Sequence, residues 1–196
     1  MVNECIDGDS ELLLFCNNDI ELINDAISEV IDVHQKNKHV VGTVGARLHF
    51  EDNTLQHYGM LMFIKKEWVA NNKLSRIEIT HDMLKQSYKY DKIGYTQVIG
   101  NTGAFLLVSK ILFNKIGGFN PTYIECFEDV ELNLELLCLN KTNILCKSAV
   151  AYHYESKTRD NDENKIKKLQ EDYKERLFPF ISNNINKIKK HIKILQ

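Results

Sequence analysis

The order of apolar and polar positions predicts a chain of alternating strands and helices. Residues 12–16 form a compact apolar run, which is typical of a buried strand, and the polar residues 17–19 end it. Apolar positions then recur at helical spacing and predict an amphipathic helix. Its stripe consists of Leu22, Ile23, Ala26, Ile27, Val30 and Ile31.

The rest of the pattern continues this alternation and predicts an α/β fold with a mixed central sheet flanked by helices. Helices are expected at 110–116, ahead of a glycine pair, and from about 129 to 139. Residues 64–92 show little periodicity and predict a long, partly ordered insertion. Further strands are expected at 40–48, 55–62, 98–108, 144–146 and 149–152.

The composition changes at Lys157, and from Asp160 onward the chain is polar and helical. Pro179 is expected to separate a helix at about 162–177 from a last segment. Two interpretations of that segment stay open: its apolar stripe lies on an anionic membrane surface, or it docks on its own domain or a partner helix. The stripe consists of Ile181, Ile185, Ile188, Ile192 and Leu195, with Lys187, Lys189, Lys190 and Lys193 off it.

The composition indicates one globular domain of ordinary size. The chain has 196 residues, of which 43% are hydrophobic and 27% charged, so it can bury one sizeable core. The formal net charge is -2 and no basic, aromatic-interleaved motif occurs, so we expect no nucleic-acid partner. Unpaired cysteines, the lack of a signal-peptide pattern and the short apolar runs favour a cytoplasmic protein.

The first candidate site is Asn17-Asn18-Asp19, which ends the first predicted strand. Ligands of open α/β sheets bind beyond strand ends, and a carboxylate there can hold a divalent cation that also contacts phosphate oxygens. Asn and Asp are also the favoured residues for capping a helix N-terminus. Taken alone, the triplet is better explained as a cap.

The second candidate is Glu128-Asp129, which lies in an acidic stretch where a helix is expected to begin. A carboxylate within hydrogen-bond reach of a substrate hydroxyl can act as a general base. Acids at a helix N-terminus are also stabilised by the helix dipole. The residues alone leave these two interpretations even.

Two weaker candidates complete the set. His153-x-Glu155 follows a predicted strand, where His153 could bind a metal or phosphate, or simply be satisfied by backbone hydrogen bonds. Thr102-Gly103-Ala104 offers backbone without bulk that a ligand can approach closely, or it is a simple strand bulge.

The order of the motifs is more specific than any one of them. From about residue 11 to 159 the chain reads N-N-D after a strand, then G-x-V-G, Q-H-x-G, T-G-A, G-G-F-N, F-E-D-V-E-L and Y-H-Y-E-S. In this order it resembles the C-terminal half of a glycosyltransferase family 2 enzyme with the GT-A fold. Members of that family transfer a sugar from a nucleotide-sugar to an acceptor hydroxyl with inversion.

The resemblance implies a role for each motif. Asp129 matches the catalytic base, with Glu128 beside it. Asp19 matches the acid that binds Mn²⁺ or Mg²⁺ and the diphosphate, and His153 matches the late histidine that completes the metal site. The implied partners are a UDP- or dTDP-sugar donor and a glycan or lipid-linked acceptor. Donor or acceptor binding is implied for Thr102, Gly103, Ala104, Asn17 and Glu155.

The resemblance also implies a division of the chain. Residues 1–159 correspond to the metal- and acceptor-binding half of the catalytic domain, and 160–196 form a helical tail. Only a short polar stretch precedes the first strand, so the family's nucleotide-binding strands have no counterpart. We therefore expect a fragment, or a partner chain that supplies the missing half. The alternative function is a truncated, catalytically inactive binding or interaction module. Glu135 also departs from the Arg found in many relatives.

Overall fold

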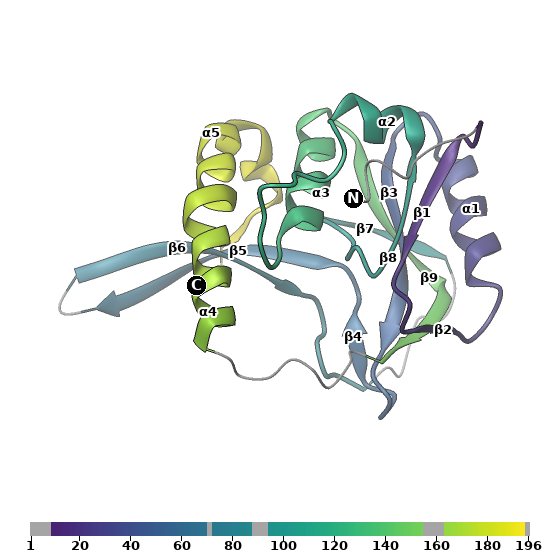
Figure 1. The fold of residues 1–196 in the computed structure, drawn as a ribbon, viewed down its shortest axis with the longest axis horizontal. Helices are drawn as coiled ribbons and strands as arrows, with labels where there is room; N and C mark the ends of the chain where they lie inside the picture. The colour runs from purple at the N-terminus through teal and green to yellow at the C-terminus, as the bar shows by residue number, and fades with distance from the viewer. Residues whose placement is uncertain (1–8, 70–71, 88–93, 155–162, 195–196) are drawn as a thin grey trace.

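A mixed β-sheet forms the centre of the protein, which a computed structural model describes for residues 9–69, 72–87, 94–154 and 163–194 (Figure 1). β3 and β9 are parallel, and the other pairs of this sheet are antiparallel. The expected α/β fold with a mixed central sheet is therefore confirmed. The strands pair in the order β1 (Leu12–Cys16), β8 (Phe105–Ser109), β3 (Val41–His49), β9 (Thr142–His153) and β2 (Ile20–Leu22), with β4 (Leu55–His57) on β3 and β7 (Tyr95–Val98) on β9.

Helices cover both faces of this sheet, as the continuous apolar run of strand β8 requires. Phe105 and Leu107 pack in one core cluster with α1 (Ala26–Lys36). Leu106 and Val108 point the other way and pack in a second cluster with α2 (Lys110–Lys115) and α3 (Glu128–Cys138). Alternate residues of a strand face opposite sides, so a continuous apolar run is buried between two helical layers.

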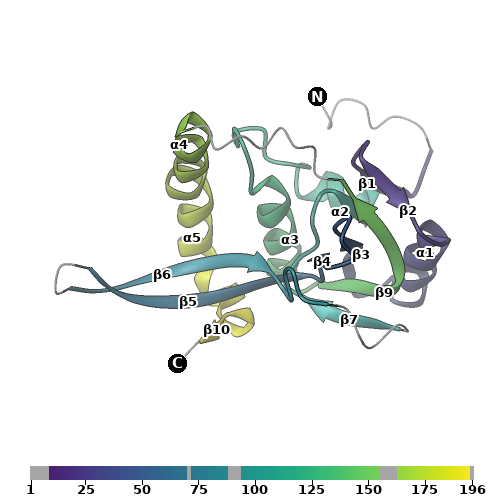
Figure 2. The same ribbon diagram turned by 90° about the horizontal axis from the view of Figure 1, so that it is seen from below.

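A smaller sheet and the C-terminal helices pack beyond α3 (Figure 2). β5 (Met60–Val69) and β6 (Asn72–His81) form a long hairpin, and β10 (Lys193–Ile194) runs parallel to β5. The tail consists of α4 (Glu163–Glu171), a π-helical segment (Asp172–Leu177), α5 (Phe178–Ile188) and a 3₁₀ turn (Lys189–His191).

The apolar stripe of the tail docks on its own domain. Ile181 and Ile188 are fully buried in a cluster with Leu134 of α3 and Met62 of β5. For the described part of the stripe, the interpretation that it lies on a membrane surface is therefore wrong, because the core covers Ile181 and Ile188 and the partly buried Ile185 and Ile192 pack against it. Leu195, the last residue of the predicted stripe, lies outside the described residues. Within the described ranges, no helix has the length and apolar content needed to cross a membrane.

The predicted insertion at 64–92 is mostly regular structure. β5 and β6 pair in register from Met60 with His81 to Val69 with Asn72. Ile77 and Ile79 of this hairpin pack against the cluster that contains the tail helices, a long-range contact that the local pattern does not show. The last part of the predicted insertion, 88–92, lies outside the described residues.

The helix predicted from Leu22 begins later, at Ala26. Leu22 ends β2, which pairs with β9, and Ile23 is 49% exposed. The Asp25 side chain then accepts a hydrogen bond from the Ser28 N–H and caps α1. Strand pairing and this cap therefore decide the helix start, although the apolar spacing extends further back.

Three other boundaries differ from the prediction. The strand expected at 98–108 is divided into β7 and β8, and the two short strands at 144–152 are one strand, β9, with an irregular register. Pro179 does not interrupt the tail helix. It lies in the first turn of α5, directly after the π-helical segment, where a missing N–H is tolerated.

Candidate active site

A pocket of about 630 Å³ gathers most of the candidate residues at the ends of β1, β8 and β9. It includes Asn17, Thr102, Gly103, Ala104, Glu128, Asp129 and His153. Asp19 contacts this group through His153, and Glu155 lies outside the described residues. The same pocket is also lined by Gln56, His57, His81 and much of the loop 119–127.

Strand pairing brings Asp19 and His153 together across the sheet. β2 pairs with β9 so that Ile20 stands opposite His153, and the Tyr154 N–H donates to the Asp19 carbonyl at 3.0 Å. The Asn17 N–H donates to the Ala104 carbonyl at 3.0 Å. The cap of α1 is Asp25, so the interpretation of Asn17 to Asp19 as its N-cap is wrong.

His153 directs its Nε2 atom toward Asp19. Its Nδ1 lies 2.7 Å from Gln56 Oε1, an acceptor, so Nδ1 carries the proton. The Gln56 amide is oriented by its own hydrogen bond to the His153 carbonyl at 3.3 Å. The other ring nitrogen, Nε2, lies 3.2 Å from Asp19 Oδ1 and 3.3 Å from Asn17 Nδ2.

This arrangement fits one edge of a cation site. A ring nitrogen and a carboxylate oxygen at this separation attract one another when a positive charge lies between them, which either a proton on Nε2 or a bound cation supplies. Two ligands of an octahedral ion at about 2.1 Å are about 3 Å apart. A ligating histidine also commonly donates its other N–H to an oxygen, as His153 does to Gln56. Among the described residues, no group of three or more His, Cys, Asp or Glu side chains converges as a metal site.

Asp129 stands at the start of α3 but does not cap it. The N-cap residue is Phe127, which has a left-handed φ of 81° and makes no side-chain cap. Asp129 Oδ2 instead accepts a hydrogen bond from the Gly103 N–H at 2.8 Å. Burial raises the pKa of Asp129, although the bond from Gly103 and the nearby His81 act against this shift. Burial and the Asp129 charge likewise raise the pKa of Glu128.

A buried polar network fixes the segment that carries Gly103. Asn133 of α3 accepts from the Asn101 N–H at 3.1 Å and donates to the carbonyls of Asn101 and Asp129 at 2.8 Å and 2.7 Å. Thr43 of β3 donates to the same Asn133 oxygen at 2.8 Å. A Cβ at Gly100 would lie 2.8 Å from the Asn133 Cβ, so this position requires glycine. The network ties the sheet, the glycine segment and the Asp129 backbone together.

The sequence reasoning gave no role to a histidine pair in the pocket. His57 and His81 face each other with their Nδ1 atoms 2.7 Å apart, and the Thr102 N–H points at His57 Nε2 at 3.4 Å. Burial and the charge of His81 lower the pKa of His57 well below its usual value. The Q-H-x-G motif was a signal for Gln56 and His57, whereas His81 lies on a hairpin that the pattern did not predict.

No protein-family model matches the chain. Among curated proteins, the O-antigen biosynthesis protein RfbC of Myxococcus xanthus is 29% identical over 156 residues, which are 78% of this chain and 12% of that protein. The uncharacterized protein y4gI of Sinorhizobium fredii (strain NBRC 101917 / NGR234) is 26% identical over 162 residues, which are 82% of this chain and 17% of that protein. The chain therefore spans only a small part of the length of these relatives.

Among solved structures, the crystal structure of GalNAc-T7 with UDP, GalNAc and Mn²⁺ aligns with a TM-score of 0.50 at 11% identity. The alignment covers 92% of this chain and 38% of GalNAc-T7. At this identity the likeness concerns the fold. Together with the similarity to the O-antigen biosynthesis protein, it supports a glycosyltransferase-like fold for this chain.

Proposed function

We propose that the pocket belongs to the catalytic centre of an inverting, family 2 glycosyltransferase of the GT-A type. It would transfer a sugar from a nucleotide-sugar to a hydroxyl of a glycan or lipid-linked acceptor. The observation that carries this proposal is the Asp129 carboxylate, which lies in the same pocket as His153 and has a pKa raised by burial. The similarities to an O-antigen biosynthesis protein and to GalNAc-T7 support it.

Asp129 is the proposed general base. It accepts the proton of the acceptor hydroxyl while that oxygen bonds to the anomeric carbon, and the bond from this carbon to the diphosphate oxygen breaks on the opposite face. A raised pKa brings the carboxylate closer to the working pH, where a base is most effective. The Gly103 N–H holds one carboxylate oxygen in place. Glu128 would stabilise positive charge that develops on the sugar ring.

The Asp19–His153 pair is proposed to hold the diphosphate of the donor. These residues would hold Mn²⁺ or Mg²⁺, which when bound would neutralise charge on the departing nucleoside diphosphate. Asn17 and the Thr102–Ala104 backbone would contact the donor or acceptor from the same pocket. Other parts of a longer protein, or a partner chain, would supply the remaining contacts to the nucleotide.

Replacement of the base tests this proposal. We expect Asp129→Asn, in a full-length or complemented protein, to lower the transfer rate by about 10²- to 10⁴-fold, the usual contribution of a general base. Asp32→Asn is the matched control, because Asp32 is an exposed carboxylate on α1. Circular dichroism checks that both variants keep the fold. Normal transfer by Asp129→Asn would show that the base is assigned wrongly.

A second candidate function is a catalytically inactive binding or interaction module. Calorimetric titration of the chain with Mn²⁺ and with UDP-sugars separates the two candidates. Binding at ordinary affinity supports the transferase. Lack of binding by a folded chain supports the module.

A further inference from the structure

The loop 119–127 forms much of the pocket wall and leads directly into Glu128 and Asp129. It contains no helix or strand, so backbone pairing does not determine its shape. The position of Asp129 and the width of the pocket therefore depend on whatever holds this loop. The loop residues that line the pocket are Phe119, Asn120, Pro121, Tyr123, Ile124, Glu125, Cys126 and Phe127.

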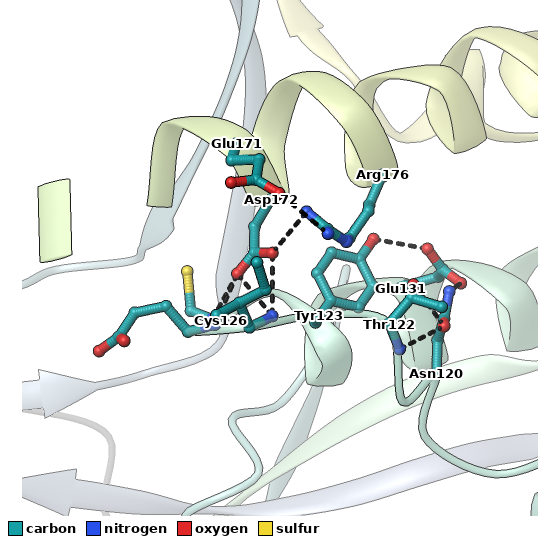
Figure 3. A network of polar contacts seen from close by, with 10 residues as sticks. Asn120, Thr122, Tyr123, Cys126, Glu131, Glu171, Asp172 and Arg176 are labelled. Atoms are coloured by element: carbon teal, nitrogen blue, oxygen red, sulfur yellow. Dashed lines mark hydrogen bonds and ion pairs between the residues drawn. The ribbon is translucent and has the colours of Figure 1, made fainter. Parts of the chain in front are cut away.

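A single carboxylate from the tail holds the end of this loop (Figure 3). Asp172 is fully buried, and three successive backbone N–H groups donate to it. The Ile124 N–H donates to both oxygens at 2.9 Å and 3.1 Å. The Glu125 and Cys126 N–H groups donate to Oδ2 at 2.7 Å and 3.1 Å. Successive amides around one anion form a strong and directional site.

The charge of Asp172 is balanced within the tail. Arg176, one turn further on, lies with Nη1 3.0 Å from Asp172 Oδ1 and Nη2 3.2 Å from Glu171 Oε1. Burial alone would raise the pKa of Asp172, but the amides of Glu125, Ile124 and Cys126 and the charge of Arg176 lower it overall. Asp172 therefore stays ionised, and its bonds to the loop are charge-assisted.

The backbone around Asp172 is also unusual. Asp172 begins the π-helical segment between α4 and α5. Such segments are rare and occur frequently at functional sites. The next residue, Tyr173, donates its hydroxyl to the Ile77 carbonyl of β6 at 2.6 Å, and Leu177 is buried in the core. The widened turn thus lets Asp172 reach the loop while its neighbours anchor the helix.

The loop is held on its other side by Glu131 of α3. The Tyr123 hydroxyl donates to Glu131 Oε2 at 2.5 Å, and the Asn120 amide donates to Oε1 at 2.8 Å. Lys165 of α4 adds an ion pair to Glu125 at 3.0 Å. The loop therefore lies between two buried carboxylates, one of which comes from the tail.

We propose that Asp172 is a positioning residue, which clamps the loop 119–127 and thereby makes the tail part of the acceptor side of the pocket. The loop is assigned to the acceptor side because it leads directly into Asp129, the residue proposed to deprotonate the acceptor. The kinetic part of this inference rests on the proposed function. The clamp itself rests on the hydrogen bonds to Asp172.

Three variants of the chain test the clamp by amide hydrogen exchange. Asp172→Asn removes the charge and one acceptor, and we expect exchange at 124–126 to rise about tenfold or more, as for a lost charged hydrogen bond. Asp172→Glu keeps the carboxylate and should restore part of the protection. Glu175→Gln, at an exposed position of the same segment, is the matched control and should change nothing.

Cys126 supplies a second, local measurement. Burial and the charge of Glu128 raise the pKa of its thiol to about 12, so it should react slowly with N-ethylmaleimide in the wild type. A released loop should raise this rate in Asp172→Asn, as peptide mapping can show. The Mn²⁺ affinity should stay within about twofold, because strand pairing holds Asp19 and His153.

The kinetic measurement uses the full-length or complemented protein, with UDP-sugars as donors and methyl hexopyranosides as acceptors. We expect Asp172→Asn to raise the acceptor KM about tenfold and to leave the donor KM within about twofold, with partial recovery in Asp172→Glu. Equal changes in both KM values, or faster exchange throughout the fold, would show a purely structural role and overturn the proposal.

Two further outcomes are distinguishable. If Asp172→Asn does not fold, the wild type decides, because exchange of the 124–126 amides as fast as in an unfolded chain would overturn the clamp. If the full-length or complemented wild type transfers no sugar, the proposed function fails. The exchange and alkylation results then still decide whether Asp172 holds the loop.

Discussion

The two sides of the pocket are built in different ways. On the sheet side, Asp19 and His153 are brought together by the pairing of β2 with β9, a ladder of backbone hydrogen bonds. On the loop side, the segment 119–127 is held by two side chains, Glu131 and Asp172. A ladder keeps its geometry when one side chain changes, whereas the loop depends on individual carboxylates. Single substitutions should therefore alter ligand affinity on the sheet side and pocket shape on the loop side.

The largest effect is expected at Asn133, a shared support that joins β3 and the glycine segment to the Asp129 backbone. Asn133→Ala would remove four hydrogen bonds to Thr43, Asn101 and the Asp129 carbonyl and leave buried partners unsatisfied. We expect a loss of about 3–4 kcal/mol in unfolding free energy, measured by chemical denaturation. Asn114→Ala, at an exposed position of α2, should stay within about 0.5 kcal/mol of the wild type. A loss below about 1 kcal/mol at Asn133 would contradict its role as the shared support.

A smaller effect, confined to the sheet side, is expected at Gln56. Gln56→Leu removes the acceptor that fixes the proton on His153 Nδ1. The affinity for Mn²⁺, measured by calorimetry, should fall about 10- to 100-fold, as for other partners of metal-bound histidines. Amide exchange at 124–126 should not change, because Asp172 holds that loop. Unchanged Mn²⁺ affinity would remove the support for a cation at His153.

The smallest effect is a pH dependence on the loop side. Burial and the charge of Glu131 raise the pKa of Glu135 from 4.5 to about 7. Because the folded pKa is the higher one, folding favours the protonated acid, and this stabilisation is lost as the pH rises through about 7. Relative to Glu135→Gln, the wild type should lose about 1 kcal/mol of unfolding free energy between about pH 5 and pH 8, after allowance for solvent screening. If the unfolding free energies of the wild type and Glu135→Gln changed in parallel with pH, the raised pKa of Glu135 would be contradicted.

The gathering of Asn17, Thr102, Gly103, Asp129 and His153 was predictable because each follows or begins an element with a strong apolar pattern. β1, β8, β9 and α3 all bury such patterns, and their ends meet at one place. The chemical roles of these residues stay predictions. Local patterns could also place α1, but not its start, since the pairing of β2 depends on a strand 130 residues away.

The role of Asp172 could not be predicted from the sequence. Its partners lie 46 to 48 residues earlier, and an acid in a polar helix resembles any solvated residue. It begins a π-helical segment and lies next to α5, which docks against α3, and the local apolar pattern predicts neither feature. Tertiary contacts therefore determine the role of Asp172, as they also determine the formation of the β5–β6 hairpin.

The buried network at Asn133 also has a consequence for the order of folding. Its hydrogen bonds join residues that are 90 positions apart at Thr43 and 32 apart at Asn101. Such distant contacts form only after the intervening chain has been brought together. A refolding chain should therefore acquire its helices and hairpins early and its pocket late. Mn²⁺ added during refolding is expected to bind only in the last kinetic phase.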